Sequence, residues 1–307
     1  MKIISLFSGA GGLDLGLVKA GHTVVWANDI DLASCATYKL NIGPHIVCKN
    51  ISDIKLNDIP DADVVVGGFP CQGFSLANKS RHPCDERNVL YKEFRRIVKG
   101  KKPKYFIAEN VRGILSLSSG EVIEKIVDDF ASAGYRISYK VFNTADYGVP
   151  QTRIRVLIAG TRKDLPKTLN LQFPVPTHDI RNWITISQAL KGIPDPGTQP
   201  NNLKNHIYSK YKVTNRNYTG HRRTNPDKPS PTILARGNGK GGVCAIQHPQ
   251  NHRRMSVRES AIIQTFPINF EFIGSMSSMY RQIGNAVPVL FAECIGKQLR
   301  ELERSQK

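Results

Sequence analysis

The chain has 307 residues, of which 40% are hydrophobic and 22% charged, and it carries a formal net charge of +18 at pH 7. This length predicts a folded chain of about two domains, and since no apolar run approaches about 18 residues, no membrane-spanning helix is expected. Six cysteines without a Cys-x-x-Cys pair favour neither a zinc site nor a disulfide framework, so we expect a cytoplasmic protein with no bound metal.

Apolar runs and helical patterns alternate through the first half of the chain. We predict strands at residues 3–7, 23–27, 63–67, 105–108, 139–142 and 156–159. Between them we predict a helix that ends near Ala20 and further helices near 32–40, 88–98 and 121–133. Alternation of this kind predicts a doubly wound, mainly parallel α/β sheet with helices on both faces.

The character of the chain changes after Phe173, where prolines and asparagines become frequent. We therefore divide the chain into residues 1–173, a loop-rich segment of residues 174–275, and a closing part of residues 276–307 with a helix near 288–302. Residues 176–275 carry 14 lysines and arginines against 5 acidic residues. Such a balance favours binding to a polyanion, most often nucleic acid, although a basic surface in contact only with solvent is the simpler alternative.

A glycine turn follows the first predicted strand and leads into a helix. Gly9, Gly11 and Gly12 allow the backbone to approach a ligand, and Asp29 follows about twenty residues later, where a ribose hydroxyl is bound in nucleotide-binding folds. Many strand-to-helix turns carry glycines without any ligand, so this pattern alone is weak. The order Gly9-Ala10-Gly11-Gly12 also differs from Gly-x-Gly-x-x-Gly, which counts against a dehydrogenase.

Cys71 lies in the loop that follows the strand at 63–67. Pro70 restricts the backbone directly before the thiol, and Gly73 and Ser75 follow within four residues, so the loop can aim a nucleophile. A buried packing cysteine is the commoner role for this residue type. The neighbouring motifs must decide between the two.

Six separated motifs occur in one order along the chain. They are the turn at 9–12, Pro70-Cys71-Gln72, Glu109-Asn110-Val111, Gln151-Thr152-Arg153-Ile154-Arg155, residues 258–267 and Gln282-Ile283-Gly284-Asn285-Ala286-Val287-Pro288. Together they resemble the cytosine-C5 DNA methyltransferases of bacterial restriction-modification systems, over nearly the whole chain. The resemblance implies a Rossmann-like fold of the S-adenosylmethionine-dependent methyltransferase type, with a second, smaller, loop-rich DNA-recognition domain.

The resemblance implies methyl transfer from S-adenosylmethionine to carbon 5 of cytosine. Cys71 would add to carbon 6 as the nucleophile, while Glu109 would hold nitrogen 3 and carry its proton near neutral pH, a state that burial favours. Arg155 would contact the base oxygen, and Arg153 would lie nearer the phosphate or the cysteine loop, both helping to activate the thiol. Taken alone, Glu109 could equally be a capping or salt-bridged carboxylate and the arginines a solvated strand end.

The same resemblance implies a methyl-donor pocket built from both ends of the chain. Asp29 stands where many relatives carry glutamate, and Ile30 where an aromatic residue often stacks on adenine. Because residues from the far end complete the pocket, the catalytic domain is expected to be discontinuous, with the last helix beside the first strand. The implied pocket residues are Phe7, Gly9, Gly11, Gly12, Leu13, Asp29, Ile30, Asp53, Ile54, Pro70, Asn285 and Val287.

A cytosine inside a duplex cannot react at its ring faces, so the target base is expected to flip out of the stack. The basic loop-rich segment would then hold double-stranded DNA, and residues 232–242 resemble a recognition segment, although their glycines could form only a hairpin turn. The DNA contacts that we predict are Ser75, Arg222, Arg223, Arg236, Lys240, Arg253 and Arg254.

Two alternatives accompany this interpretation. A tRNA-methylating branch shares most of the motifs, but its Cys-Phe-Thr signature is absent and the recognition segment here is larger and more basic. A catalytically inert DNA-binding protein on the same frame is disfavoured by the intact Cys71, Glu109, Arg153 and Arg155. We expect a monomer that protects host DNA from a partner restriction endonuclease, at a DNA sequence that the resemblance does not specify.

Overall fold

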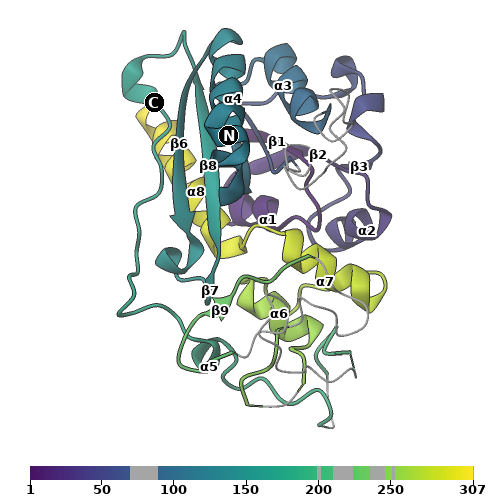
Figure 1. The fold of residues 1–307 in the computed structure, drawn as a ribbon. Helices are drawn as coiled ribbons and strands as arrows, with labels where there is room; N and C mark the ends of the chain where they lie inside the picture. Colours follow the sequence, from purple (N-terminus) through teal and green to yellow (C-terminus); the bar gives the residue numbers. More distant parts are fainter. Residues whose placement is uncertain (70–88, 199–201, 210–223, 236–245, 251–252, 307) are drawn as a thin grey trace.

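The computed structural model describes residues 1–69, 89–198, 202–209, 224–235, 246–250 and 253–306. Within these ranges seven strands form one sheet in the order β3-β2-β1-β4-β5-β8-β6 (Figure 1). They are β1 (Lys2–Leu6), β2 (Thr23–Asp29), β3 (Ile46–Cys48), β4 (Val64–Gly67), β5 (Tyr105–Val111), β6 (Tyr135–Asn143) and β8 (Ile154–Arg162). A small second sheet pairs β7 (Gln151–Thr152) with β9 (Ser230–Pro231).

The helices follow the strands along the chain. They are α1 (Gly12–Lys19), α2 (Leu32–Asn41), α3 (Val89–Lys101), α4 (Glu121–Ser132), α5 (Ile186–Ala189), α6 (Val257–Ile263), α7 (Met276–Asn285) and α8 (Val289–Ser305). Short 3-10 helices include η5 (Arg112–Leu115) and η7 (Thr144–Tyr147). None of the described helices is both long and apolar enough to cross a bilayer.

The doubly wound, mainly parallel sheet that the sequence predicts is confirmed. β3, β2, β1, β4 and β5 run parallel, whereas β8 is antiparallel to both β5 and β6. The central strand β4 is buried along its whole length, as expected for an uninterrupted β-branched run covered on both faces. The three-residue strand β3 was not predicted, because it is too short to show an alternating pattern.

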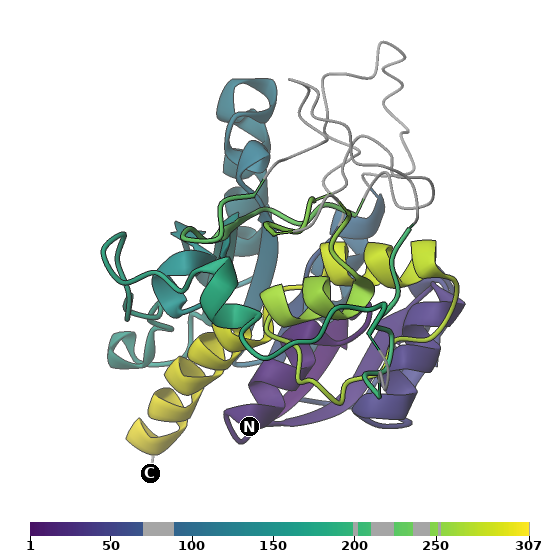
Figure 2. The ribbon, with the colours of Figure 1, turned by 90° about the horizontal axis from the view of Figure 1, so that it is seen from below.

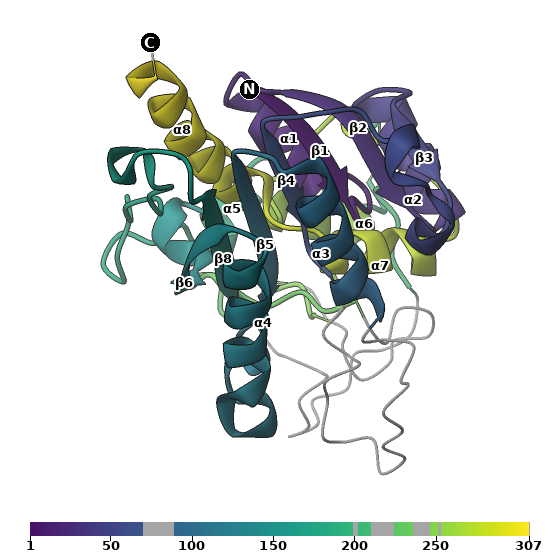
Figure 3. The ribbon, with the colours of Figure 1, turned by 90° about the horizontal axis from the view of Figure 1, so that it is seen from above.

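Two apolar cores cover the two faces of the sheet. On one face α1, α2 and α8 pack against strand residues such as Ile3, Val64 and Ile107. On the other, α3 and α4 pack against residues such as Ile4, Val65 and Phe106. Viewed along the sheet, α3 and α4 lie on one side, and α1 and α8 on the other (Figure 3). Neighbouring residues of one strand thus face opposite cores, as strand geometry requires.

A third core lies in the loop-rich segment and the helix that follows it. It joins α5, α6 and α7 through residues such as Ile186, Val257 and Ile283, and α6 lies beside α7 (Figure 2). Ser256 caps the amino terminus of α6 in a reciprocal pair: Glu259 N–H donates to the Ser256 hydroxyl, and Ser256 N–H donates to the Glu259 carboxylate.

The helix predicted near residues 288–302 is α8, and it returns to the beginning of the chain. It packs directly on α1, where a side chain at Gly16 would lie 2.4 Å from Cβ of Ala292. The amino group of Met1 also contacts Glu303 at 2.7 Å. α7, which precedes α8, was not predicted as a helix.

The strand order places a topological switch point between β1 and β4. The chain moves outward from β1 to β2 and β3, then returns to the other side of β1 to form β4. In open α/β sheets ligands bind at the carboxyl ends of the strands at such a point. The glycine turn after β1 and the segment that leads to Cys71 after β4 both begin there.

Candidate active site

Four strands bring chemistry-bearing residues to this one edge of the sheet. Leu6 pairs with Gly67, and Gly67 with Ala108, so the residues that follow these three emerge side by side. Those residues are Phe7, Gly68 and Glu109. Because β8 runs in the opposite direction, its first residues lie at the same edge, with Arg155 opposite Val111.

Glu109 and Arg155 lie in direct contact at this edge. The register places them on the same face of the sheet, and Nε of Arg155 lies 2.7 Å from Oε1 of Glu109. Both side chains are about nine-tenths buried, with 12% and 11% exposed. Oε1 is buried and forms no hydrogen bond with any residue that the structure describes. The contact with Arg155 is therefore an ion pair whose geometry is not that of a hydrogen bond. Oε1 is thus held by Arg155, while the other carboxylate oxygen, Oε2, lies toward the backbone at Gly68.

The backbone that leads to Cys71 runs directly beside Glu109. A side chain at Gly68 would place its Cβ 3.1 Å from Oε2 of Glu109, so glycine allows the carboxylate and this backbone to approach. Phe69 then packs against Tyr91 and Phe94, and its carbonyl accepts a hydrogen bond of 3.0 Å from the Asn110 amide. The residue after Glu109 therefore fixes the chain two residues before Cys71. Pro70, Cys71 and Ser75 lie outside the described residues.

Arg153 is buried in the interior, whereas the cysteine loop, its expected neighbour, lies outside the described residues. It is only 2% exposed, and its guanidinium donates to the Ile233 carbonyl at 3.1 Å and to the Gly284 carbonyl at 3.0 Å. Burial, and then the charge of Arg155, lower its pKa to about 9, whereas Glu109 acts in the opposite direction. Arg153 therefore stays charged at neutral pH, close behind the Glu109–Arg155 pair. Its Nε has no hydrogen-bond partner among the residues that the structure describes.

The glycine turn divides into one open position and two packed ones. Gly9 has a φ of +54° with nothing within 4 Å of the position that a Cβ would take. A Cβ at Gly11 would meet Ile42 at 2.1 Å, and one at Gly12 would meet the Val287 carbonyl at 2.4 Å. Gly11 and Gly12 are thus required by packing of α1 against α2 and the closing residues, while Gly9 faces open space.

Asp29 lies at the carboxyl end of β2, beside this open space. Its carboxylate accepts hydrogen bonds from Gly9 N–H at 2.8 Å and from Asp31 N–H at 2.9 Å. Burial raises its pKa, while these two backbone donors act in the opposite direction. Ile30 follows with its side chain 68% exposed, as an apolar surface available to a ligand.

The remaining predicted pocket residues lie on separate elements. Asp53 and Asn285 are exposed, whereas Ile54, Leu13 and Val287 are buried. Val287 follows α7 and reaches Gly12 through its carbonyl, so the two ends of the chain do meet at the glycine turn. The structure thus brings the turn and the closing residues together.

The predicted DNA contacts are placed only in part. Arg253 is largely buried and donates to both oxygens of Glu259 at 2.8 Å. Arg254 is 4% exposed, and its guanidinium lies 3.6 Å from the centre of the Tyr280 ring. These positions do not support a DNA contact for either residue. Arg222, Arg223, Arg236 and Lys240 lie outside the described residues.

Sequence patterns gave no indication of a buried polar network beneath the glycine turn. Asp14 is fully buried and accepts hydrogen bonds from the Ser5 hydroxyl at 2.6 Å and the Tyr38 hydroxyl at 2.7 Å. Burial raises the pKa of Asp14 to about 6, although these hydrogen bonds act against the increase. An acidic residue in the first turn of a helix is ordinarily attributed to the helix dipole, so nothing in the sequence distinguished it.

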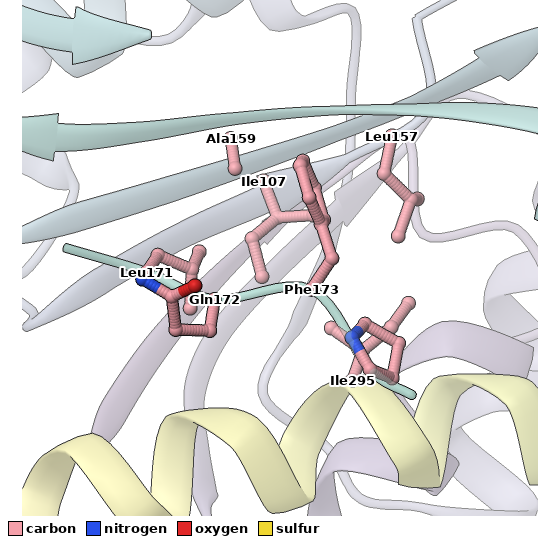
Figure 4. A pocket seen from close by; sticks show the side chains of 8 residues that line it. Ile107, Leu157, Ala159, Leu171, Gln172, Phe173 and Ile295 are labelled. Carbon is pink, nitrogen blue, oxygen red and sulfur yellow. The ribbon is translucent and has the colours of Figure 1, made fainter. Parts of the chain in front are cut away.

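An apolar cavity lies elsewhere, between the sheet and α8. Ile107, Leu157 and Ala159 line it from the strands, Ile295 from α8, and Leu171 and Phe173 from the segment between them (Figure 4). The site described above has ion pairs and carboxylates, but this lining offers almost no polar group. The cavity is therefore a gap in packing, not a second candidate site.

Comparison with known proteins gives a consistent result. A family model described as C-5 cytosine-specific DNA methylase matches residues 1–301. The chain is 40% identical to Type II methyltransferase M.NgoFVII of Neisseria gonorrhoeae, over 94% of this chain and 83% of that protein. It is 36% identical to Type II methyltransferase M.FnuDI of Fusobacterium nucleatum, over 98% and 94% of the two chains.

Solved structures show the same architecture. The crystal structure of an E. coli prophage protein described as a DNA modification methyltransferase superimposes with a TM-score of 0.76, at 26% identity and 99% coverage of both chains. The S. pombe Dnmt2 methyltransferase superimposes with a TM-score of 0.74 at 19% identity, over 100% of this chain and 99% of that one. The second likeness concerns the fold alone.

Proposed function

The chain belongs to the C-5 cytosine-specific DNA methylase family and is a DNA (cytosine-5-)-methyltransferase, and from this premise we propose how its residues carry out the reaction. The observation that carries the proposal is the contact between Glu109 and Arg155, at the point where the chain enters the Cys71 loop. An acid and a cation on the sheet edge from which the chain leads to Cys71 match what activation of a cytosine ring requires.

Carbon 5 of cytosine is a poor nucleophile, so the enzyme must push electrons into the ring. We assign this task to the Cys71 thiolate, which forms a bond to carbon 6 while the electron pair of the ring double bond moves toward carbon 5. S-adenosylmethionine, when bound, supplies an electrophilic methyl group. Once carbon 5 is methylated, loss of its proton returns an electron pair to the ring and releases the thiolate.

Glu109 is the residue that stabilises the activated ring. Arg155 holds its Oε1 at 2.7 Å, and a carboxylate preorganised in this way costs little to align when charge develops on a ligand. We propose that Glu109 hydrogen-bonds to nitrogen 3 and the exocyclic amine of a flipped-out cytosine. Arg155, held beside Glu109 by its own bond of 2.7 Å to the Ile154 carbonyl, contacts the base oxygen.

The open side of the glycine turn fits the methyl donor. Gly9 presents backbone without obstruction, the carboxylate of Asp29 retains lone pairs for ribose hydroxyls, and Ile30 offers an apolar face. We propose that the donor is held by Phe7, Gly9, Asp29, Ile30, Asp53, Ile54 and Asn285, with Leu13 and Val287 as buried wall residues. Gly11 and Gly12 serve by shaping the turn, and Pro70 completes the cysteine loop.

We propose that the loop-rich segment, residues 174–275, binds double-stranded DNA. Its basic balance supports this, and Ser75, Arg222, Arg223, Arg236 and Lys240 remain our predicted contacts. Several relatives are Type II methyltransferases, which supports a role in protecting host DNA beside a restriction endonuclease. Arg253 and Arg254 are left out of this set, because they are committed to Glu259 and Tyr280.

One experiment tests both substrate and nucleophile. The wild-type protein, Cys71→Ala and the matched control Cys294→Ala, whose thiol lies on α8, are given labelled methyl donor with duplex DNA or with bulk tRNA. We expect label in DNA for the wild type and the control, and none for Cys71→Ala, which still binds DNA. Bisulfite sequencing of plasmid from the expressing host then locates the methylated cytosine. Label in tRNA alone would overturn the DNA substrate, and normal turnover by Cys71→Ala would overturn the nucleophile.

A further inference from the structure

Arg153 connects two segments that lie far apart in the sequence. Its Nη1 donates to the Ile233 carbonyl and its Nη2 to the Gly284 carbonyl, at 3.1 and 3.0 Å. The first segment is the beginning of the predicted recognition segment, residues 232–242, and the second leads directly into Asn285 of the proposed methyl-donor pocket. One buried guanidinium thus connects the proposed DNA-binding segment with the proposed methyl-donor pocket.

The same two segments also touch each other without any side chain between them. A Cβ at Gly284 would lie 2.6 Å from the nitrogen of Ala235 and 2.6 Å from the carbonyl carbon of Leu234. These distances are too short for any real Cβ contact. The end of α7 therefore packs directly against the backbone of residues 234–235, at the beginning of the recognition segment. The contact exists only because residue 284 is glycine.

Two buried glutamines add a second connection at this point. Gln151 accepts a hydrogen bond of 2.8 Å from Ile233 N–H and donates one of 2.8 Å to the Gln264 side chain. Gln264 in turn donates to the Ile283 carbonyl at 2.6 Å. Both side chains are fully buried. Residues 233 and 283–284 are therefore held together twice, by Arg153 and by this amide pair.

We propose that Arg153 is a positioning residue that couples DNA binding to methyl-donor binding, by holding residues 232–235 and 284–287 as one unit behind the Glu109–Arg155 pair. This inference rests on the proposed function. It also replaces the expectation that Arg153 acts on the phosphate or the cysteine loop, since its guanidinium is committed to two backbone carbonyls.

The coupling follows from the geometry. DNA that restrains residues 232–235 also restrains residues 284–287, because the two share the guanidinium and the contact at Gly284. The methyl donor then binds a segment that is already restrained, and by reciprocity the donor strengthens DNA binding by the same factor. Lysine cannot replace arginine here, because a single ammonium group does not reproduce the planar fork that reaches both carbonyls.

The test measures the affinity of S-adenosylhomocysteine, a product that permits no turnover, with and without a saturating duplex that carries the methylated site. For the wild type we expect the duplex to tighten binding by about tenfold, within the usual range of coupling between sites. For Arg153→Lys we expect a factor of less than about two, while affinity without DNA changes by less than about threefold.

Arg258→Lys is the matched control. Arg258 is also buried and donates to backbone carbonyls, those of Lys204, Pro267 and Phe270, none of which belongs to residues 232–235 or 284–287. We expect it to lower thermal stability and to leave the coupling factor unchanged. If Arg153→Lys does not fold, Gly284→Ala replaces it, since the added methyl group separates the same two segments.

The outcomes separate this inference from the proposed function. A wild type that methylates DNA but shows no coupling, or equal coupling in Arg153→Lys and Arg258→Lys, overturns the positioning role and leaves the methyltransferase assignment intact. A wild type that transfers no methyl group to any duplex overturns the proposed function itself. Retained coupling in Gly284→Ala would likewise contradict the inference.

Discussion

Glu109 in the sheet edge and Glu259 in the loop-rich segment are both buried carboxylates held against an arginine, yet their surroundings differ in one respect. Glu259 is 2% exposed, and its oxygens accept from both terminal nitrogens of Arg253 at 2.8 Å and from Ser256 N–H at 2.7 Å. Glu109 meets Arg155 through a single contact, and its buried Oε1 forms no hydrogen bond with the described residues.

The difference shows which pair stabilises the fold and which one is prepared for a substrate. Burial alone would raise the pKa of Glu259, but the hydrogen bonds from Arg253 and Ser256 lower it below its usual value. A carboxylate whose oxygens are all bonded has nothing left to offer a ligand. A buried carboxylate that has only one ion-pair contact carries a desolvation cost in the free protein, which a ligand that bonds to its other oxygen reduces.

The largest effect is expected at Glu109. Glu109→Gln keeps the shape but removes the group that exchanges a proton with the base, so we expect the methylation rate to fall by about 10²–10⁴-fold. The urea midpoint of unfolding should fall less than in a variant of Glu259, because only one ion-pair contact is lost, although Arg155 is then left buried without its partner. Single-turnover methylation and urea unfolding measured on the same preparation check this. A large loss of stability with modest loss of rate would make Glu109 a structural residue like Glu259.

The reverse pattern is expected at Glu259. Glu259→Gln leaves the buried Arg253 charge without its main partner, and breaking a buried pair in this way costs about 3–5 kcal/mol of unfolding free energy. Because the pKa of Glu259 is lowered, its stabilisation is present above its ordinary pKa of 4.5 and is lost as the pH falls through the lowered value. The difference from wild type in urea unfolding should therefore shrink in acid.

A matched carboxylate provides the control for Glu259. Glu271 faces Lys204 at 4.0 Å on the surface. Since exposed pairs of this kind contribute about 0–1 kcal/mol, Glu271→Gln should leave the unfolding free energy nearly unchanged. Equal losses in the two variants would mean that burial and hydrogen bonding of Glu259 do not determine its contribution.

The strands and helices of residues 1–173 could be predicted from sequence, because buried apolar side chains leave a periodic pattern along the chain. β4 is a buried run that ends at a glycine, and the buried run of β5 ends directly before Glu109. Their order along the chain was enough to predict that Glu109 lies near the backbone that leads to Cys71. The antiparallel direction of β8 was not predicted, since strand direction leaves no local pattern. Nevertheless, this reversal is what brings Arg155 to the same edge.

The loop-rich half was less predictable, because side chains bonded to backbone carbonyls hold it together. Arg153, Arg253 and Arg258 look like surface or catalytic arginines in the sequence, yet each is buried with specific partners. No spacing in the sequence predicts that Arg153 donates to the carbonyl of Ile233. The sequence also cannot separate two roles of the glycines at 11 and 12, because a glycine required by packing resembles one required by a ligand.

Asp14 extends the comparison to a buried carboxylate with no arginine. Its pKa is raised from an ordinary value of 3.8 to about 6, first by burial. A raised pKa in the folded state means that its contribution to stability is full below 3.8 and is lost as the pH rises through about 6. Asp14→Asn should therefore be more stable than wild type above this range, by up to about 3 kcal/mol, with the advantage disappearing near pH 4.

Urea unfolding of both proteins across this pH range checks the expectation for Asp14, with Asp128→Asn, an exposed position on α4, as the control. An advantage that does not vary with pH would show that the Ser5 and Tyr38 hydroxyls, and not the charge, determine the behaviour of the site.

The smallest effect is expected where a carboxylate–arginine pair is exposed. Arg281 of α7 meets Asp31, the amino-terminal cap of α2, at 2.9 Å, with the arginine side chain 48% exposed. Arg281→Gln should cost less than about 1 kcal/mol, and the cost should vanish in high salt because solvent and ions screen the pair. Arg281 is changed because Asp31 also caps α2 through Ser34 N–H. A loss at low salt as large as that of Glu259→Gln, which disappears in high salt, would mean that charge joins α7 to the sheet, and not mainly the buried contacts of Arg153, Gln264 and Gly284.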